Sequence, residues 1–204
     1  MINRGMVPGG NMAERNLSEF VRVYEGALSD AVCDDIVRRF EEDTAHHSGP
    51  GGVPVGAAHV DARSNWTELN IQSLDHWSDV LSQLLPATTQ YSERYAEDCR
   101  IWFPSRAKLE DYRIKRYQPD PGDQFHPHVD IDCLDHAKRF LVLFWYLTDV
   151  EEGGETFFND LDYGVKPKKG RMLMFPPFWM YPHTGVRPIS GTKYILGTYL
   201  NFAE

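Results

Sequence analysis

The chain has 204 residues, of which 42% are hydrophobic and 13% aromatic, with a formal net charge of −9 and an isoelectric point near 5.3. This length and composition predict one folded domain with a sizeable core and exclude a wholly disordered chain. The acidic balance argues against a general binder of nucleic acid or of anionic membranes.

The cysteines and the N-terminus carry the signals of cellular location. Cys33, Cys99 and Cys133 lie far apart without a C-x-x-C motif, which is typical of reduced thiols. No apolar stretch approaches the roughly 20 residues that span a bilayer, and residues 1–16 are glycine-rich and polar, without the apolar segment of a signal peptide. We therefore expect a cytoplasmic protein with a flexible leader over residues 1–16 and a single domain over residues 17–204, and no membrane or nucleic-acid partner.

The first structured elements are a strand and a helix. Residues 19–25 are rich in β-prone side chains and predict a first strand. Ser29 is a predicted N-cap, and apolar residues then recur at helical spacing as far as Phe40. The glycine- and proline-rich stretch 44–56 predicts a loop, which is a candidate lid, and residues 60–71 predict an extended edge.

A second helix is predicted from Ser73, with leucines on one side. Pro86 should end or kink it, and tyrosines further on indicate that it resumes to about Asp98. Residues 28–98 are therefore expected to form a helical support for the rest of the domain.

From Tyr112 onward the hydrophobic period changes from that of a helix to that of a strand. Glycine and proline turns separate the apolar runs. The predicted strands are 112–118, 125–130, 140–147, 155–158, 163–166, 171–175, 182–186 and 193–200. Short strands in this number, led by two helices, predict an α+β, mainly β fold: a double-stranded β-helix, or jelly roll, whose core spans residues 112–202 and whose strands form one closed sheet.

Two distant segments carry a possible metal site. Alternate side chains of a strand share a face, so His128 and Asp130 point the same way. With His183 from another strand they would give two imidazoles and one carboxylate, which can hold Fe(II) and leave open positions. The same periodicity places His126 on that face, so a His126–His128 pair is an alternative, and Zn²⁺ is an alternative metal.

Lys193 adds a second signal. A lysine in a predominantly apolar strand is costly to bury without an anionic partner, so it would anchor a dicarboxylate bound across the open metal positions. Lys193, Ile195, Gly197 and Tyr199 should share one face, while the alternate residues face the helices. Tyr146, the polar exception on its own face, could hydrogen-bond the same carboxylate.

Four pieces of sequence together resemble one known family. They are Tyr117 with Pro121-Gly122-Asp123 and His128-Val129-Asp130; Arg139 with the run from Tyr146 to Thr156; Gly170 to Phe175; and His183-Thr184-Gly185 with Pro188, Gly191 and Lys193. The chain resembles the Fe(II)/2-oxoglutarate-dependent dioxygenases, and within them the prolyl 4-hydroxylase-like group.

The resemblance implies Fe²⁺ on His128, Asp130 and His183, with 2-oxoglutarate and O₂ as cosubstrates and ascorbate as a candidate reductant. It implies that Lys193 binds the far carboxylate of 2-oxoglutarate. The remaining implied contacts are Tyr117, Thr156 and Tyr146 with the cosubstrate, and Arg63 and Arg139 with the substrate. Tyr199 stands where many relatives carry tryptophan, which changes the substrate-side wall.

Three functions compete on this evidence. The first is a hydroxylase of a peptide or protein residue, with proline as the leading candidate. The second is a hydroxylase of a free amino acid or other small metabolite, and the third is a jelly roll that binds metal or ligand without catalysis. Lys193 and the Glu-Gly-Gly-Glu-Thr turn count against the third. The Asp130 carboxylate favours hydroxylation over halogenation, since related halogenases lack that ligand.

Overall fold

The computed structural model describes residues 16–55 and 64–203. The predicted leader over residues 1–16 falls outside these ranges except for Asn16, and so does Arg63. Within the described residues, no helix has both the length and the apolar composition needed to cross a membrane. Cys33, Cys99 and Cys133 are all free thiols, as predicted.

Two helices form the predicted support. Helix α1 (Asp30–Glu42) begins after Ser29, whose side chain accepts a hydrogen bond from the backbone of Val32, and so confirms the predicted cap. Helix α2 (Ser78–Cys99) begins five residues later than predicted, because residues 75–77 form a separate 3-10 turn.

Of the two predicted effects of Pro86, an end of the helix is wrong, since α2 continues through it, while a kink stays a prediction. Pro86 lies on the exposed side of the helix, as does Ser82 one turn earlier. The carbonyl that loses its hydrogen bond to proline therefore faces solvent, which lowers the cost of a proline inside a helix.

All eight strands predicted after Tyr112 form, most with ends trimmed by one or two residues, and three more precede them. The strands are β1 (Arg22–Tyr24), β2 (Thr67–Asn70), β3 (Ala107–Leu109), β4 (Arg113–Tyr117), β5 (Phe125–His128), β6 (Arg139–Tyr146), β7 (Thr156–Phe158), β8 (Tyr163–Val165), β9 (Met172–Phe175), β10 (His183–Gly185) and β11 (Lys193–Phe202).

The strands form two sheets, so the expected single closed sheet is wrong. The larger sheet has the order β1-β9-β6-β11-β4-β2 with β3 paired to β11, and the smaller has the order β5-β10-β7-β8. An isolated bridge between Asn65 and Gln124 joins them at one corner. They pack face to face through buried aromatic side chains, including Phe144, Phe158 and Phe175, so burial between sheets replaces closure by hydrogen bonds. The architecture is the predicted jelly roll with helical support.

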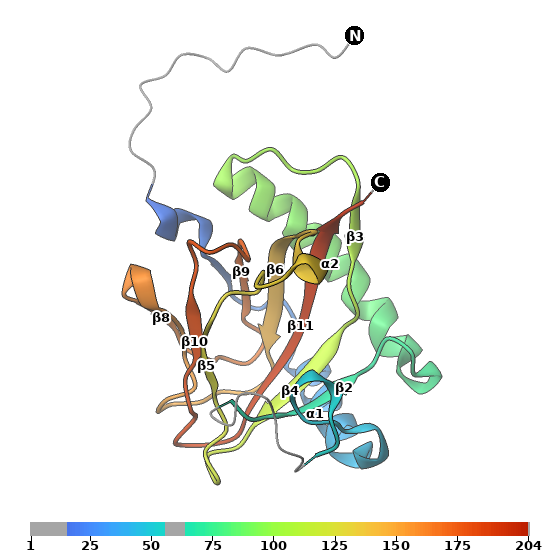
Figure 1. Cartoon of the computed structure of the whole chain (residues 1–204). Coiled ribbons are helices and arrows are strands. Elements are labelled where there is room, and N and C mark those ends of the chain that lie inside the picture. The colour runs from blue at the N-terminus through green and yellow to red at the C-terminus, as the bar shows by residue number, and fades with distance from the viewer. Residues whose placement is uncertain (1–15, 56–63, 204) are drawn as a thin grey trace, which may run out of the picture.

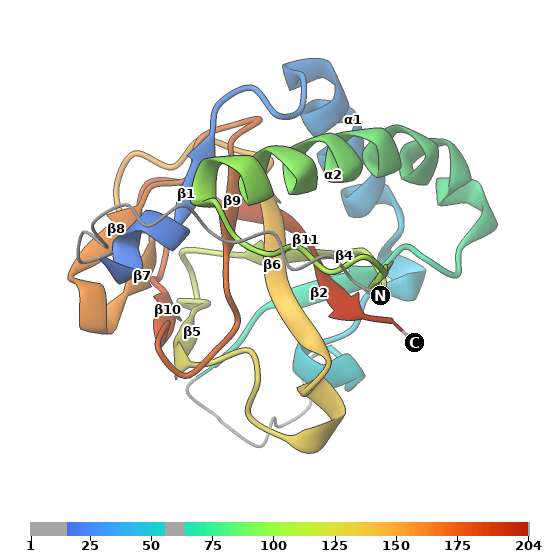
Figure 2. The ribbon, with the colours of Figure 1, turned by 90° about the horizontal axis from the view of Figure 1, so that it is seen from above.

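The molecule has three layers, in which the helices cover one face of the larger sheet and the smaller sheet faces the other (Figures 1 and 2). Strand β11 packs against a different layer on each of its two faces. Tyr194, Leu196 and Leu200 pack in the core shared with the helices, whereas Ile195 and Tyr199 pack against the core between the sheets. The predicted alternation is confirmed, and it directs Lys193 into the space between the sheets.

Candidate active site

Three predicted ligands meet between the sheets. His128 is the last residue of β5, and it pairs in register with His183, the first residue of β10. Asp130 follows β5 and turns toward both rings. Its Oδ1 lies 3.9 Å from His128 Nε2, and its Oδ2 lies 3.6 Å from His183 Nε2. Two imidazole nitrogens and one carboxylate therefore face a common point.

The orientation of these groups fits a metal ion. His128 Nδ1 lies 2.8 Å from the carbonyl of His126, and His183 Nδ1 lies 3.1 Å from the carbonyl of Tyr181. Because a carbonyl only accepts, each Nδ1 carries the proton and each Nε2 keeps its lone pair for a ligand. Asp130 Oδ2 is buried and has no hydrogen-bond partner among the described residues. A bound cation would satisfy this oxygen.

The electrostatics keep the site in the protonation state that metal binding requires. Burial, reinforced by the nearby His183, lowers the pKa of His128 to about 3, so its ring is neutral. Burial alone would raise the pKa of Asp130, but His183, His128 and a hydrogen bond from Tyr199 lower it below its usual value. The carboxylate is therefore ionised at neutral pH.

Tyr199 and Arg139 hold Asp130 in place. The Tyr199 hydroxyl donates to Asp130 Oδ1 at 2.8 Å, and Arg139 Nη1 donates to the Asp130 carbonyl at 3.0 Å. The Arg139 guanidinium lies 3.9 Å from the centroid of the Tyr199 ring and pairs with Glu110 at 2.7 Å. These contacts give both residues a supporting place around Asp130, whereas the substrate contacts predicted for them stay predictions. No sequence signal singled out Glu110.

Lys193 lies in a nearby buried pocket. The residue is only 2% exposed, and its ammonium lies 5.1 Å from the centroid of the Tyr117 ring and 5.8 Å from that of Tyr146. Within the described ranges this ammonium makes no hydrogen bond or ion pair. Burial, together with the positive charge of Lys115, lowers its pKa to about 7, although Glu155 acts in the opposite direction. An unpaired buried ammonium of this kind suits a bound carboxylate.

The other predicted cosubstrate residues surround Lys193. Tyr117 and Thr156 are buried and line the same cavity. Tyr146 is fully buried, and its hydroxyl lies 2.8 Å from Thr156 Oγ1 and 3.2 Å from the Val165 carbonyl. The structure therefore brings Tyr117, Thr156 and Tyr146 to Lys193, with Tyr146 orienting the threonine hydroxyl.

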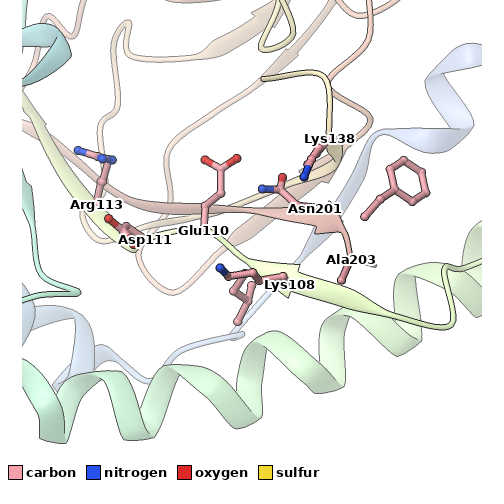
Figure 3. A pocket seen from close by; sticks show the side chains of 9 residues that line it. Lys108, Glu110, Asp111, Arg113, Lys138, Asn201 and Ala203 are labelled. Atoms are coloured by element: carbon pink, nitrogen blue, oxygen red, sulfur yellow. The ribbon is translucent and has the colours of Figure 1, made fainter. Parts of the chain in front are cut away.

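A cavity of about 660 Å³ connects the triad with Lys193. Gly51 and Gly52 of the predicted loop also line it, while the lid itself stays a prediction. A second cavity has a volume of about 500 Å³. The two cavities share Glu110, Asp111 and Arg113 in their walls. Figure 3 shows the charged side chains, Glu110 and Arg113 among them, that surround the second cavity. Together the two spaces extend well beyond the triad.

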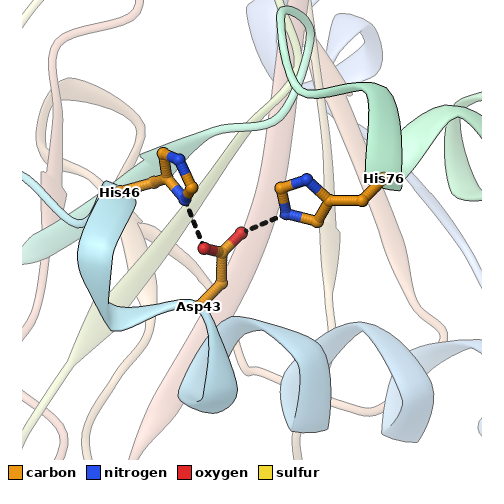
Figure 4. Close-up of side chains that lie close together, drawn as sticks. All are labelled: Asp43, His46 and His76. Carbon is orange, nitrogen blue, oxygen red and sulfur yellow. Dashed lines mark hydrogen bonds and ion pairs between the residues drawn. The ribbon is translucent and has the colours of Figure 1, made fainter.

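A second cluster of possible ligands lies at the surface. The Asp43 carboxylate is flanked by His46 and His76, as Figure 4 shows, and it also accepts a hydrogen bond of 2.9 Å from Trp77 Nε1. Three donors already satisfy this carboxylate. The cluster therefore ties the end of α1 to the start of α2, and it differs from the triad, where Asp130 retains an unused oxygen.

Comparison with known proteins agrees with this site. Residues 112–201 match the model of the 2OG-Fe(II) oxygenase superfamily, a span that contains the triad and Lys193. The human multifunctional procollagen lysine hydroxylase and glycosyltransferase LH3 is 26% identical over 179 residues, which are 85% of this chain and 22% of that protein. The chain thus spans about a fifth of the length of the curated relatives it matches.

Solved structures share the fold. The viral collagen prolyl hydroxylase of Paramecium bursaria Chlorella virus-1, in a 2OG complex, has a TM-score of 0.64 at 23% identity, covering 91% of this chain and 97% of that one. A Trichoplax adhaerens prolyl hydroxylase, in complex with a hypoxia inducible factor peptide fragment, has a TM-score of 0.68 at 13% identity, covering 91% and 84%. Residues 112–201 therefore carry the sequence pattern of the 2OG-Fe(II) oxygenase superfamily, the Fe(II)- and 2-oxoglutarate-dependent dioxygenases, and the chain shares the fold of these solved structures.

Proposed function

We propose that the protein hydroxylates an unactivated C–H bond of a residue in a peptide or protein, with proline as the leading candidate. In this proposal His128, Asp130 and His183 hold Fe(II). Lys193 binds the distal carboxylate of 2-oxoglutarate, with Tyr117, Thr156 and Tyr146 around it. The observation that carries the proposal is a triad with an unsatisfied Asp130 oxygen beside an unpaired buried ammonium.

The bound iron and cosubstrate supply the oxidising chemistry, in which O₂, 2-oxoglutarate and R–H give R–OH, succinate and CO₂. The chain's residues do the positioning. Tyr199 and Arg139 fix Asp130, and backbone carbonyls fix the tautomers of the two histidines. Ascorbate is the reductant we propose for restoring Fe(II).

Two findings support a peptide substrate. The relatives include proteins named as collagen and hypoxia-inducible-factor prolyl hydroxylases and as a procollagen lysine hydroxylase. In addition, Glu110, Asp111 and Arg113 line both the triad cavity and the second cavity, so an extended chain could contact residues of both.

A screen for oxygen incorporation tests this function. Peptides and free metabolites are incubated with the enzyme, Fe(II), ascorbate and ¹⁸O₂, with 2-oxoglutarate present or withheld, and products are identified by mass spectrometry. We expect 2-oxoglutarate-dependent gain of one labelled oxygen in a peptide, and none with His183→Ala. Labelling confined to free amino acids would contradict the peptide assignment, and no labelling of any compound would contradict hydroxylation.

The choice between the two histidines of β5 has its own prediction. His128→Ala should abolish Fe(II) binding, because its Nε2 faces the triad, whereas His126→Ala should leave binding within a few-fold of wild type, since only the His126 carbonyl supports the site. Equilibrium titration with Fe(II) under argon measures both. Loss of Fe(II) binding in His126→Ala but not in His128→Ala would show that His126, and not His128, is the metal ligand on β5.

A further inference from the structure

Lys115 is a second cation inside the active-site cavity that the function above does not use. It lies in the middle of β4, in register with Glu68 of β2 on one side and Ile195 of β11 on the other. Residues two apart on a strand share a face, so Lys115 points into the same space as Tyr117. It lines the cavity that holds the triad.

The side chain of Lys115 is held between aromatic rings. Its ammonium lies 4.7 Å from the centroid of the Trp66 ring and 5.5 Å from that of Phe125. These contacts stabilise the charge and fix its position. They leave its three N–H donors unused, because across the described residues Lys115 forms no hydrogen bond and no ion pair.

The neighbouring carboxylates are already engaged. Glu68 accepts a hydrogen bond of 2.9 Å from Trp66 Nε1 and lies 3.5 Å from Arg113 Nη1. Asp130 belongs to the triad and is held by Tyr199. Burial lowers the pKa of Lys115, although Glu68 and Asp130 partly oppose that effect. Lys115 is half-buried, and a cation withdrawn this far from water without a partner is costly for the fold unless a ligand supplies one.

Lys115 and Lys193 line the same cavity, but their ammonium groups lie over different aromatic rings. The Phe125 ring, on which the ammonium lies, stacks against His128 with centroids 3.4 Å apart and planes 14° apart. Lys193, by contrast, lies over Tyr117. The positive charge of Lys115 lowers the pKa of Lys193, and neither ammonium forms an ion pair within the described residues. One dicarboxylate bound to Lys193 and the metal leaves Lys115 free for a second anion.

We propose that Lys115 binds a carboxylate of the substrate and so makes the enzyme selective for acidic substrates. The proposal rests on the hydroxylase function given above. The carboxylate has two possible sources, an acidic side chain of a peptide or the α-carboxylate of a free amino acid. For the peptide, the second cavity, which shares Glu110, Asp111 and Arg113 with the triad cavity, is a place for residues next to the reacting one.

Binding of matched compounds tests the proposal without turnover. The full chain is loaded with Mn(II) and 2-oxoglutarate under argon and titrated calorimetrically. The peptide series is acetyl-Ala-Ala-Pro-Ala-Ala-amide, with each alanine replaced in turn by Asp, Asn or Lys. L-proline and L-prolinamide form the free-acid pair.

Wild type is expected to bind one Asp peptide about thirtyfold more tightly than the matching Asn peptide, or L-proline about thirtyfold more tightly than L-prolinamide, which lacks the carboxylate. This is the fold-change that about 2 kcal/mol from a charge pair gives. Lys115→Met should abolish the preference, Lys115→Arg should keep part of it, and Lys115→Glu should favour the Lys peptide. Lys168→Met, which changes an exposed lysine paired with Glu25, is the matched control and should bind as wild type does. The affinity for 2-oxoglutarate, measured separately, should change less than threefold in Lys115→Met.

The outcomes separate the two proposals. The role of Lys115 is overturned if acidic compounds do not bind, or if they bind no more tightly than their matched amides. It is also overturned if the preference for acidic compounds survives Lys115→Met. A loss of 2-oxoglutarate affinity in Lys115→Met with the acid preference retained also overturns it, by assigning Lys115 to the cosubstrate. Acid-selective binding without oxygen incorporation supports carboxylate binding by Lys115 and contradicts hydroxylation. Oxygen incorporation without a preference for acidic compounds supports hydroxylation and contradicts carboxylate binding by Lys115.

Discussion

Lys193→Met is expected to weaken 2-oxoglutarate binding by roughly thirtyfold or more while leaving Fe(II) affinity nearly unchanged. The distal carboxylate would lose a charge-assisted contact in a buried pocket, which costs on the order of 2–5 kcal/mol. Lys193→Arg should restore only part of the affinity, because the planar guanidinium needs a differently shaped pocket. The 2-oxoglutarate dissociation constant, measured with Mn(II) in place of iron, reports the effect. Wild-type affinity in Lys193→Met would remove the lysine from the cosubstrate site.

The same substitution should stabilise the ligand-free protein. Burial lowers the pKa of Lys193 to about 7, below its value in the unfolded chain of about 10.4. The cost of the buried charge is therefore fully present below pH 7, and it disappears as the pH rises toward 10. Lys193→Met should be more stable than wild type by on the order of 1–4 kcal/mol at pH 6, and the difference should shrink with rising pH. Denaturant unfolding of both proteins across this pH range measures it, and an unchanged difference would contradict the buried-charge account.

Asp130→Ala should reduce Fe(II) affinity by more than roughly a hundredfold, because it removes the only carboxylate of the triad. Tyr199→Phe is the informative companion, since it keeps the ligand and removes only the hydroxyl that donates to Asp130 Oδ1. We expect a loss of about 10- to 100-fold, the range for groups that orient a metal ligand. Tyr163→Phe, at a surface tyrosine that is 39% exposed, is the control. Equal Fe(II) affinity in wild type and Asp130→Ala would show that the metal binds elsewhere.

The strands and the triad were predictable because their signals are local. Alternation along residues 193–200 depends only on the pleat of one strand, and it identified which side of β11 meets the helices. His128 and Asp130 are two residues apart, so their shared direction needs no knowledge of the fold. His183 could be named as the third ligand from its chemistry, but its place beside His128 could not be derived locally, because their register is a long-range pairing.

The remaining features depend on tertiary structure. Lys115 is a lysine in an ordinary amphipathic pattern, and only the pairing of β4 with β2 and β11 shows that it faces the cavity. Pro86 is a second example. Helix α2 accommodates this proline because it lies on the exposed side of the helix, and that side is set by how α2 packs. Separation of the strands into two sheets depends on packing between aromatic faces, which periodicity within a strand does not report.

The most direct test of the central claim is anaerobic visible spectroscopy of the purified chain with Fe(II) and 2-oxoglutarate. If His128, Asp130 and His183 hold iron while Lys193 anchors the cosubstrate, adding both together should produce a weak metal-to-ligand charge-transfer band that neither gives alone. His183→Ala should lack the band, while His126→Ala should keep it. A wild-type protein that shows no band and no affinity for 2-oxoglutarate would contradict the assignment of this site.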